Sequence, residues 1–210
     1  MPIKMINGSG SIYFLNRSNG GSVLLKKETP PPPQEPIQIL LNSEFTTGST
    51  HWTASGTFGT FSTNNASRPA VYQNTLVFSY SDAAGIVSQT VDVSQNIQTY
   101  DEFNSVMRIR HIQNTSPWGS TSSYSSIDKF YFMVEFFDTN NIMLINKRIP
   151  PSGTENCPRY YTEYSLSLNR NEIVNFNDIR YVKVTVFGDD TAFWNGNYGP
   201  QVDYIRLYVI

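Results

Sequence analysis

Short strand-like runs separated by turn residues fill the chain from residue 37 to its end, and this pattern limits the possible folds most strongly. The runs recur every 8 to 14 residues, and none has the 3.6-residue apolar period of an amphipathic helix. Aromatic residues, which favour pleated sheets, make up 14% of the chain. The pattern predicts an all-β sandwich. The predicted strands are 37–41, 57–61, 75–80, 86–93, 106–112, 130–137, 142–149, 161–168, 181–187 and 202–209.

Two of these runs show the strand period clearly. In residues 130–137 (FYFMVEFF) and 181–187 (YVKVTVF), apolar side chains occupy every second position. Such alternation indicates a strand with one buried face and one wetted face. A polar turn, Asp138 to Asn141, then predicts a hairpin between 130–137 and 142–149.

A proline-rich segment divides the chain. Residues 30–36 (PPPPQEP) predict an extended linker of the polyproline type. Upstream, residues 11–15 and 22–27 are strand-like and are joined by NRSNGG, which predicts a β-hairpin. The sequence thus predicts an N-terminal hairpin that acts as an anchor over residues 1–29, followed by the linker and by a sandwich over 37–210.

The predicted hairpin needs a surface to cover it, because an isolated two-stranded hairpin is marginally stable in water. Its apolar face is expected to consist of Ile12, Phe14, Val23 and Leu25. They either pack on the rest of this chain or dock onto another structural subunit. We expect the second arrangement, in a homo-oligomer or a larger assembly.

Composition excludes several classes of protein. The chain has 15 Lys and Arg against 17 Asp and Glu, a net charge of −2, so it is not a basic protein that binds nucleic acid through phosphates. The single cysteine, Cys157, excludes an internal disulfide and a cysteine zinc site. No apolar run is long enough to span a membrane. The start lacks the apolar core of a secretory signal, so we expect release by lysis or assembly, or a trimmed chain.

Motifs for catalysis are weak. His51 and His111 lack the spacing of a metalloprotease helix, and Cys157 has no base beside it in the sequence. A pair of carboxylates suited to a glycosidase occurs by chance in a chain of this length. The sequence therefore predicts a protein that is not an enzyme, and a catalytic hydrolase is the least favoured reading.

Loop aromatics next to amides and carboxylates suggest carbohydrate binding. Ser, Thr and Asn make up 61 of the 210 residues, so hydrogen-bonding side chains are plentiful. The loop 113–126 carries Trp118 and Tyr124. The loop 188–199 combines two rings, two acidic groups and two amides: Asp189, Asp190, Trp194, Asn195, Asn197 and Tyr198. The alternative is that Trp194 plugs the end of the sandwich while the Asp pair caps a turn.

Three segments in order carry a resemblance to a known family. They are LLNSEFTTGSTHWTASG at 40–56, GIVSQTVDVSQNIQTYDEF at 85–103 and GPQVDYIRLYV at 199–209. The order resembles the galactose-binding-like modules, jelly-roll carbohydrate-binding modules attached to glycoside hydrolases and found in many surface and virion proteins. The resemblance covers residues 37–210 and implies a jelly-roll β-sandwich.

The same resemblance implies two structural features. In that family a structural Ca²⁺ often joins the first and last strands, and the matching carboxylates here are Glu44 and Asp203, with a carbonyl from Asn42. The alternative is that Glu44 and Asp203 are solvent-facing charges at strand ends. Trp52 matches the family's structural tryptophan and is expected in the core.

Two functions follow as hypotheses. The first is a structural or attachment protein on the surface of a virus or phage particle, in the capsid or a tail fibre, anchored by the hairpin and presenting a glycan-binding sandwich. The alternative is an extracellular carbohydrate-binding module associated with a secreted glycan-degrading enzyme.

Overall fold

The computed structural model describes residues 3–6, 12–17, 23–28, 35–55, 69–78, 83–111, 128–152, 154, 156–190 and 199–210. The chain divides into two compact units, Met1–Glu35 and Pro36–Ile210. The division falls within the proline-rich segment predicted at 30–36, and residues 30–34 of that segment lie outside the described residues. No helix in the described ranges is long and apolar enough to cross a membrane.

The first unit contains a three-stranded antiparallel sheet in the order β1-β2-β3. Its strands are β1 (Ile3–Ile6), β2 (Ile12–Arg17) and β3 (Val23–Glu28). The predicted hairpin is confirmed as β2 and β3, and the four-residue strand β1 was not predicted. The register sets Ile3 opposite Leu15 and Leu15 opposite Leu25, so one row across this sheet is apolar in sequence. It sets Ile12 opposite Glu28 and Phe14 opposite Lys26, so these two positions alternate with those of Val23 and Leu25. The prediction of one apolar face formed by Ile12, Phe14, Val23 and Leu25 was therefore wrong.

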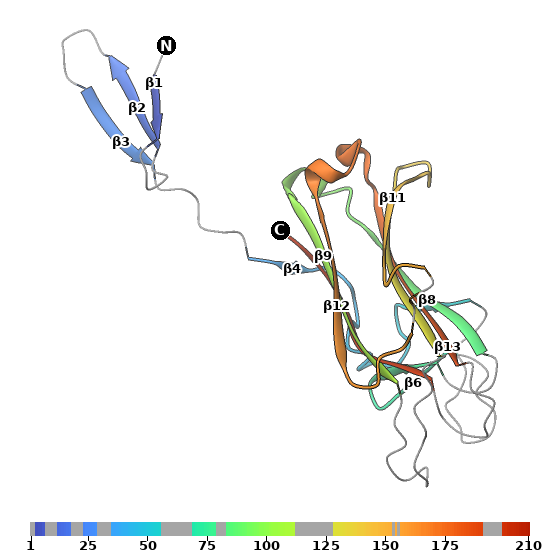
Figure 1. Ribbon diagram of the computed structural model, residues 1–210. Helices are drawn as coiled ribbons and strands as arrows, with labels where there is room; N and C mark the ends of the chain where they lie inside the picture. Colours follow the sequence, from blue (N-terminus) through green and yellow to red (C-terminus); the bar gives the residue numbers. More distant parts are fainter. Residues whose placement is uncertain are drawn as a thin grey trace. The chain divides into compact units, whose positions relative to one another are not determined.

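The second unit is an all-β jelly-roll sandwich of two antiparallel sheets, as predicted (Figure 1). The first sheet has five strands in the order β11 (Met143–Ile149), β10 (Lys129–Phe137), β13 (Tyr181–Asp190), β8 (Ala83–Asp92) and β5 (Thr53–Ala54). The second has six strands: β12 (Thr162–Asn169), β9 (Glu102–His111), β14 (Pro200–Val209), β7 (Thr75–Val77) and β6 (Ala70–Tyr72), with β4 (Ile37–Gln38) paired to β14. Three single turns of 3-10 helix complete this unit: η1 (Ile97–Thr99), η2 (Arg170–Glu172) and η3 (Phe176–Asp178).

Strand alternation determines which side chains form the core. Every second residue of β9 and β10 is buried, and the same holds for Val182, Val184 and Val186 on β13. The register places Val134 opposite Val184, so these inward rows stay aligned across the sheet. Because side chains alternate, the intervening residues form the outer face of each sheet.

Aromatic rings fill the space between the sheets. The ring of Phe103 packs edge-to-face on Phe136, with centroids 5.0 Å apart, and lies 5.9 Å from the ring of Phe176. Trp52 is buried, as predicted, and its Nε1 donates a hydrogen bond to the carbonyl of Asn42. The buried indole N–H thus has a hydrogen-bond partner within the loop that follows β4.

Two paired glycines allow Phe78 to pack directly against the first sheet. Gly188 on β13 lies opposite Gly85 on β8. A Cβ on Gly188 would come within 2.2 Å of the Cγ of Phe78, which is closer than atoms can approach. Glycine at position 188 is therefore required by this close packing.

The predicted strands match the structure where they are long. The runs 106–112, 130–137, 142–149, 161–168, 181–187 and 202–209 correspond to β9, β10, β11, β12, β13 and β14, with shifts at their ends. The run 37–41 shortens to the two residues of β4, and the run 57–61 lies outside the described residues. The short strands β5 and β6 were not predicted.

Candidate functional site

The residues predicted to bind ligand fall mostly outside the described ranges. Trp118 and Tyr124 belong to residues 112–127, and Trp194, Asn195, Asn197 and Tyr198 belong to residues 191–198, both outside the part that the structure describes. Asp190 is the last residue of β13. Asp189 is half-buried and lies opposite Lys129 in the register of β13 and β10. The predicted site at this end of the sandwich therefore stays a prediction, with Asp189 as its described member.

Three side chains stack on the outer face of the five-stranded sheet, close to Asp189 along β13. The rings of Tyr131 (β10) and Phe187 (β13) are opposite in register and nearly parallel, with centroids 4.9 Å apart and an interplanar angle of 12°. The guanidinium carbon of Arg148, on β11, lies 4.1 Å from the centroid of the Tyr131 ring. Because β11 and β13 flank β10 on opposite sides, these three side chains form a row across three strands, here called the aromatic strip.

Polar side chains lie beside the aromatic strip on the same face. Thr185 Oγ1 lies 3.1 Å from Glu135 Oε2, and Lys183 Nζ lies 3.5 Å from the same carboxylate oxygen. At the opposite edge of the same sheet, Thr53 Oγ1 on β5 donates a hydrogen bond to the carbonyl of Ser88 on β8. The outer face of this sheet therefore combines the aromatic strip with hydroxyl and charged groups.

Glu44 and Asp203, predicted as metal ligands, lie around one polar pocket on the outer face of the other sheet, and each is paired with an arginine. Arg108 Nη1 lies 2.9 Å from Asp203 Oδ2, and Arg206 Nη2 lies 2.5 Å from Glu44 Oε1. The pocket has a volume of about 360 Å³. This arginine pocket is lined by Glu44, Thr46, Gln73, Asn74, Arg108, Asp203, Tyr204 and Arg206.

Local backbone features position these side chains. The register of β14 against β9 shifts between Val202 and Tyr204, so Asp203 is the extra residue of a β-bulge. Gln73 and Asn74 form the β6–β7 turn with positive φ angles of 48° and 59°. The loop that carries Glu44 is held against β14 by a hydrogen bond from the Ile205 N–H to the Ser43 carbonyl.

Two contacts, one to the hydroxyl and one to the ring, hold the Tyr204 side chain in the arginine pocket. Its hydroxyl is hydrogen-bonded to Glu163, and the guanidinium of Arg206 lies 4.2 Å from its ring centroid. Burial, together with the Glu163 hydrogen bond, raises the pKa of Tyr204 to about 12. The phenol therefore remains protonated at neutral pH.

The residues around Glu44 and Asp203 do not fit a calcium ion in this arrangement. Both carboxylates already face a guanidinium, whose positive charge opposes a cation at the same place. The carbonyl of Asn42 accepts from Trp52 Nε1 and from the Phe45 N–H. Within the described ranges, no group of three or more His, Cys, Asp or Glu side chains could hold a metal ion. Calcium binding by Glu44, Asp203 and Asn42 thus stays a prediction that requires both ion pairs to open.

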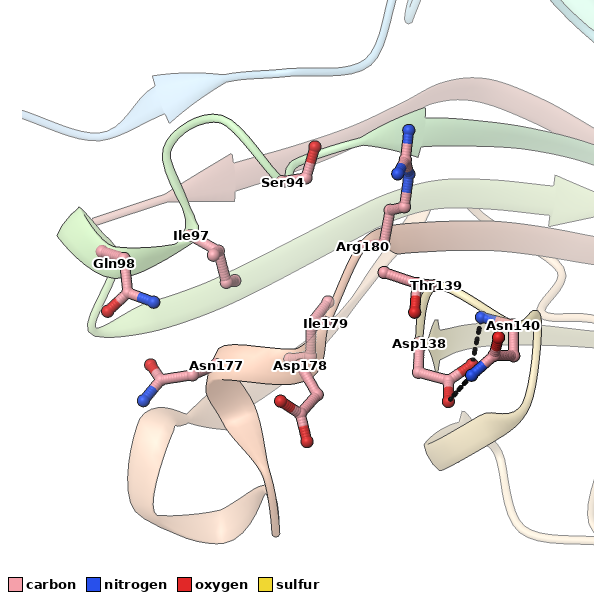
Figure 2. A pocket seen from close by; sticks show the side chains of 10 residues that line it. All are labelled: Ser94, Ile97, Gln98, Asp138, Thr139, Asn140, Asn177, Asp178, Ile179 and Arg180. Atoms are coloured by element: carbon pink, nitrogen blue, oxygen red, sulfur yellow. Dashed lines mark hydrogen bonds between the residues drawn. The ribbon is translucent and has the colours of Figure 1, made fainter.

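A second pocket, of about 380 Å³, lies between loops of the sandwich (Figure 2). Its walls come from the β8–η1 loop, the β10–β11 turn and the segment around η3, with buried Ile97 and Ile179 among the lining residues. Asp138 Oδ1 accepts hydrogen bonds from the N–H groups of Asn140 and Ile142, each 2.8 Å long. Asp138 therefore closes its own turn.

The buried polar groups belong to the core. Both Asp128 and His111 are fully buried, with His111 Nε2 2.6 Å from Asp128 Oδ2. Burial, with a smaller contribution from the charge of Asp128, raises the pKa of the Cys157 thiol far above its usual range. Because the thiolate is the reactive form, Cys157 is unsuited to act as a nucleophile.

No motif in the sequence predicts the aromatic strip directly. Tyr131, Phe187 and Arg148 come from three separate runs, and their meeting depends on the register of β11, β10 and β13. The available signal was the position of each residue on the outward side of an alternating strand. The arginines of the arginine pocket share that signal, since Arg108 and Arg206 alternate with buried residues.

Comparison with known proteins finds no matching family model and no matching curated protein. Among solved structures, a carbohydrate-binding module of the β-sandwich superfamily matches with 13% identity and a TM-score of 0.43, covering 99% of this chain and 74% of that one. A Clostridium thermocellum xylanase 10B fragment with CBM22-1 and GH10 modules matches with 10% identity and a TM-score of 0.39 over 83% of this chain. An arabinose-bound GH51 α-L-arabinofuranosidase matches with 14% identity and a TM-score of 0.41 over 82% of this chain.

The chain spans about a quarter of the two glycosidase structures, 26% of the arabinofuranosidase and 28% of the xylanase fragment. At these identities and TM-scores, the matches assign neither a family nor a ligand to this chain.

Proposed function

We propose that this protein binds carbohydrate without catalysing a reaction, and that the glycan lies against the aromatic strip on the outer face of the five-stranded sheet. The observation that carries the proposal is the stacked row of Arg148, Tyr131 and Phe187 on an outward sheet face. The three side chains are half-buried on this outward face, so part of their aromatic surface remains accessible as a contact surface.

The aromatic strip and the polar side chains beside it have the chemistry that binds a sugar. A sugar ring has apolar C–H groups that pack on aromatic surface and hydroxyls that exchange hydrogen bonds with polar side chains. The strip offers the first, and beside it the partly exposed Lys183 and Glu135 offer the second, while the buried Thr185 bonds to the Glu135 carboxylate. Because the rings support one another, they lose little conformational freedom when a ligand binds.

The loop residues predicted from the sequence extend the same proposal. Asp189 lies two positions beyond Phe187 and therefore on the same face of β13. Residues 112–127 precede β10, and residues 191–198 follow β13. In this proposal their predicted ligand residues add to the end of the glycan site nearest Asp189.

The N-terminal unit has the role of an anchor in this proposal. The apolar row of Ile3, Leu15 and Leu25 supports docking of its sheet onto another structural subunit. Attachment to the surface of a virus or phage particle is the finer form of the proposal, and an extracellular module of a glycan-degrading enzyme is the alternative. Recovery of the chain from purified particles or as a free protein distinguishes the two.

The test of the glycan site compares two variants on a glycan array and by calorimetry with the best array ligand. We expect Phe187→Ala to weaken binding at least tenfold, which corresponds to about 1.4 kcal/mol. Tyr181→Ala is the matched control, because Tyr181 lies on the same face of the same strand but outside the strip. Equal affinities of the wild type and Phe187→Ala, with unchanged melting curves, would contradict the proposal.

A further inference from the structure

The arginine pocket lies on the outer face of the six-stranded sheet, whereas the aromatic strip lies on the outer face of the other sheet. We propose that it is a second binding site, which takes one neutral sugar residue. This site shares no residue with the strip and does not depend on it.

Charge balance selects a neutral ligand. Two guanidinium groups, Arg108 and Arg206, face two carboxylates, Asp203 and Glu44, so the lining has no net formal charge. For an anion such as sulfate, repulsion by the two carboxylates offsets attraction to the two guanidinium groups, and for a cation such as Ca²⁺ the signs reverse, so neither ion gains a net attraction. A neutral ligand meets neither repulsion.

Hydrogen-bonding capacity selects a polyhydroxylated ligand. The contact between Arg108 and Asp203 uses one N–H of a guanidinium that carries five, and one of two carboxylate oxygens. A hydroxyl group both donates and accepts, so neighbouring hydroxyls of a sugar match a guanidinium and carboxylate held side by side. The amides of Gln73 and Asn74 add further donors and acceptors at the rim.

Tyr204 supplies the apolar component of the site. Its ring lines the pocket, while Arg206 and Glu163 hold it in one orientation. The pocket volume of about 360 Å³ falls within the range of small-molecule sites, about 300–1,000 Å³. A single sugar residue is thus a suitable occupant.

The site is preorganised by rigid elements. Arg108 on β9 and Tyr204 on β14 come from paired central strands. The β-bulge in β14 fixes the position of Asp203. Charged side chains that are already paired lose less freedom on binding than free ones. A small ligand can therefore bind without a rearrangement of the sheet.

The test is an NMR titration of the full chain with methyl glycosides of glucose, galactose, mannose and xylose, and separately with sodium sulfate and calcium chloride. We expect at least one glycoside to shift the backbone amides of Gln73 and Asn74 in a saturable manner. We expect neither salt to do so at matched ionic strength. No saturation with any glycoside, or saturation of these amides by sulfate or calcium alone, would overturn the proposal.

Variants separate this site from the strip. Arg108→Gln is expected to weaken glycoside binding at least tenfold, whereas Arg159→Gln, which removes an exposed arginine outside both proposed sites, leaves it unchanged. Thr46→Trp, at an exposed loop position, is expected to abolish binding by filling the pocket even if Arg108→Gln fails to fold. An equal loss with Arg159→Gln, or full affinity with Thr46→Trp, would contradict a site in the arginine pocket.

Discussion

Nε2 of His111 lies 2.6 Å from Oδ2 of Asp128, and both side chains are fully buried. His111 is the last residue of β9, and Asp128 immediately precedes β10. The pair therefore joins the two ends of the segment that contains Trp118 and Tyr124, and it also ties one sheet of the sandwich to the other.

The first prediction follows from this pair. Removing one partner takes a polar contact away from the other buried group, so His111→Leu should lower the free energy of unfolding by about 1–3 kcal/mol. The double variant His111→Leu, Asp128→Ala should lose less than the sum of the two single variants, as measured by denaturant unfolding. Strict additivity would show that the two side chains do not interact. The exposed pair Lys147–Glu172 is the control, and Lys147→Gln should cost less than about 1 kcal/mol.

The second prediction concerns the close packing of Phe78 on Gly188. A Cβ at position 188 would overlap the Phe78 ring, so Gly188→Ala should destabilise the sandwich by about 1–3 kcal/mol. When Phe78 is already alanine, the same glycine substitution should add little cost, because the overlapping ring is absent. A cost that is equal in both backgrounds, measured by thermal melting, would assign the effect to the backbone instead.

The third prediction is a pH dependence from Tyr204. The folded protein keeps the Tyr204 proton up to about pH 12, whereas the ordinary pKa of the phenol is 10.0. The folded state therefore binds more protons than the unfolded state between these values, and stability falls as the pH rises from 10 to 12. Tyr204→Phe should fall less steeply over this interval in urea unfolding experiments. Identical slopes for the variant and the wild type would show that Tyr204 is not the titrating group.

The fourth prediction concerns the two compact units. Because the chain divides between residues 35 and 36, deletion of residues 1–29 should leave the melting temperature of the sandwich unchanged. If the N-terminal sheet is an anchor, the same deletion should abolish assembly with other subunits, as measured by sedimentation. Loss of the cooperative melting transition would instead make the N-terminal unit part of the sandwich core.

The fold could be predicted from the sequence because apolar and polar residues alternate along its long strands. Strands β9 and β10 bury alternate side chains over ten and nine residues, which gives a clear signal, and β13 buries Val182, Val184 and Val186 in the same period. Strands β5 and β6 have two and three residues, too few for any period to show.

The sites could be predicted only in part, because they depend on register and on ion pairing. Glu44 and Asp203 line one pocket, and the calcium ion predicted between them stays a prediction. Their arginine partners were not predicted. Arg108 lies far from Asp203 in the sequence and reaches it only through the pairing of β9 with β14, and Arg206 lies far from Glu44 in the sequence. The stack of Tyr131 on Phe187 depends in the same way on the pairing of β10 with β13.

The most direct test of carbohydrate binding at the aromatic strip is an NMR titration of the labelled protein with the best ligand from the glycan array. We expect the backbone amides of Tyr131, Phe187 and Arg148 to shift in a saturable manner, and Phe187→Ala to remove these shifts. Saturable binding that leaves all three amides unchanged, or no binding to any glycan on the array, would contradict the proposed function.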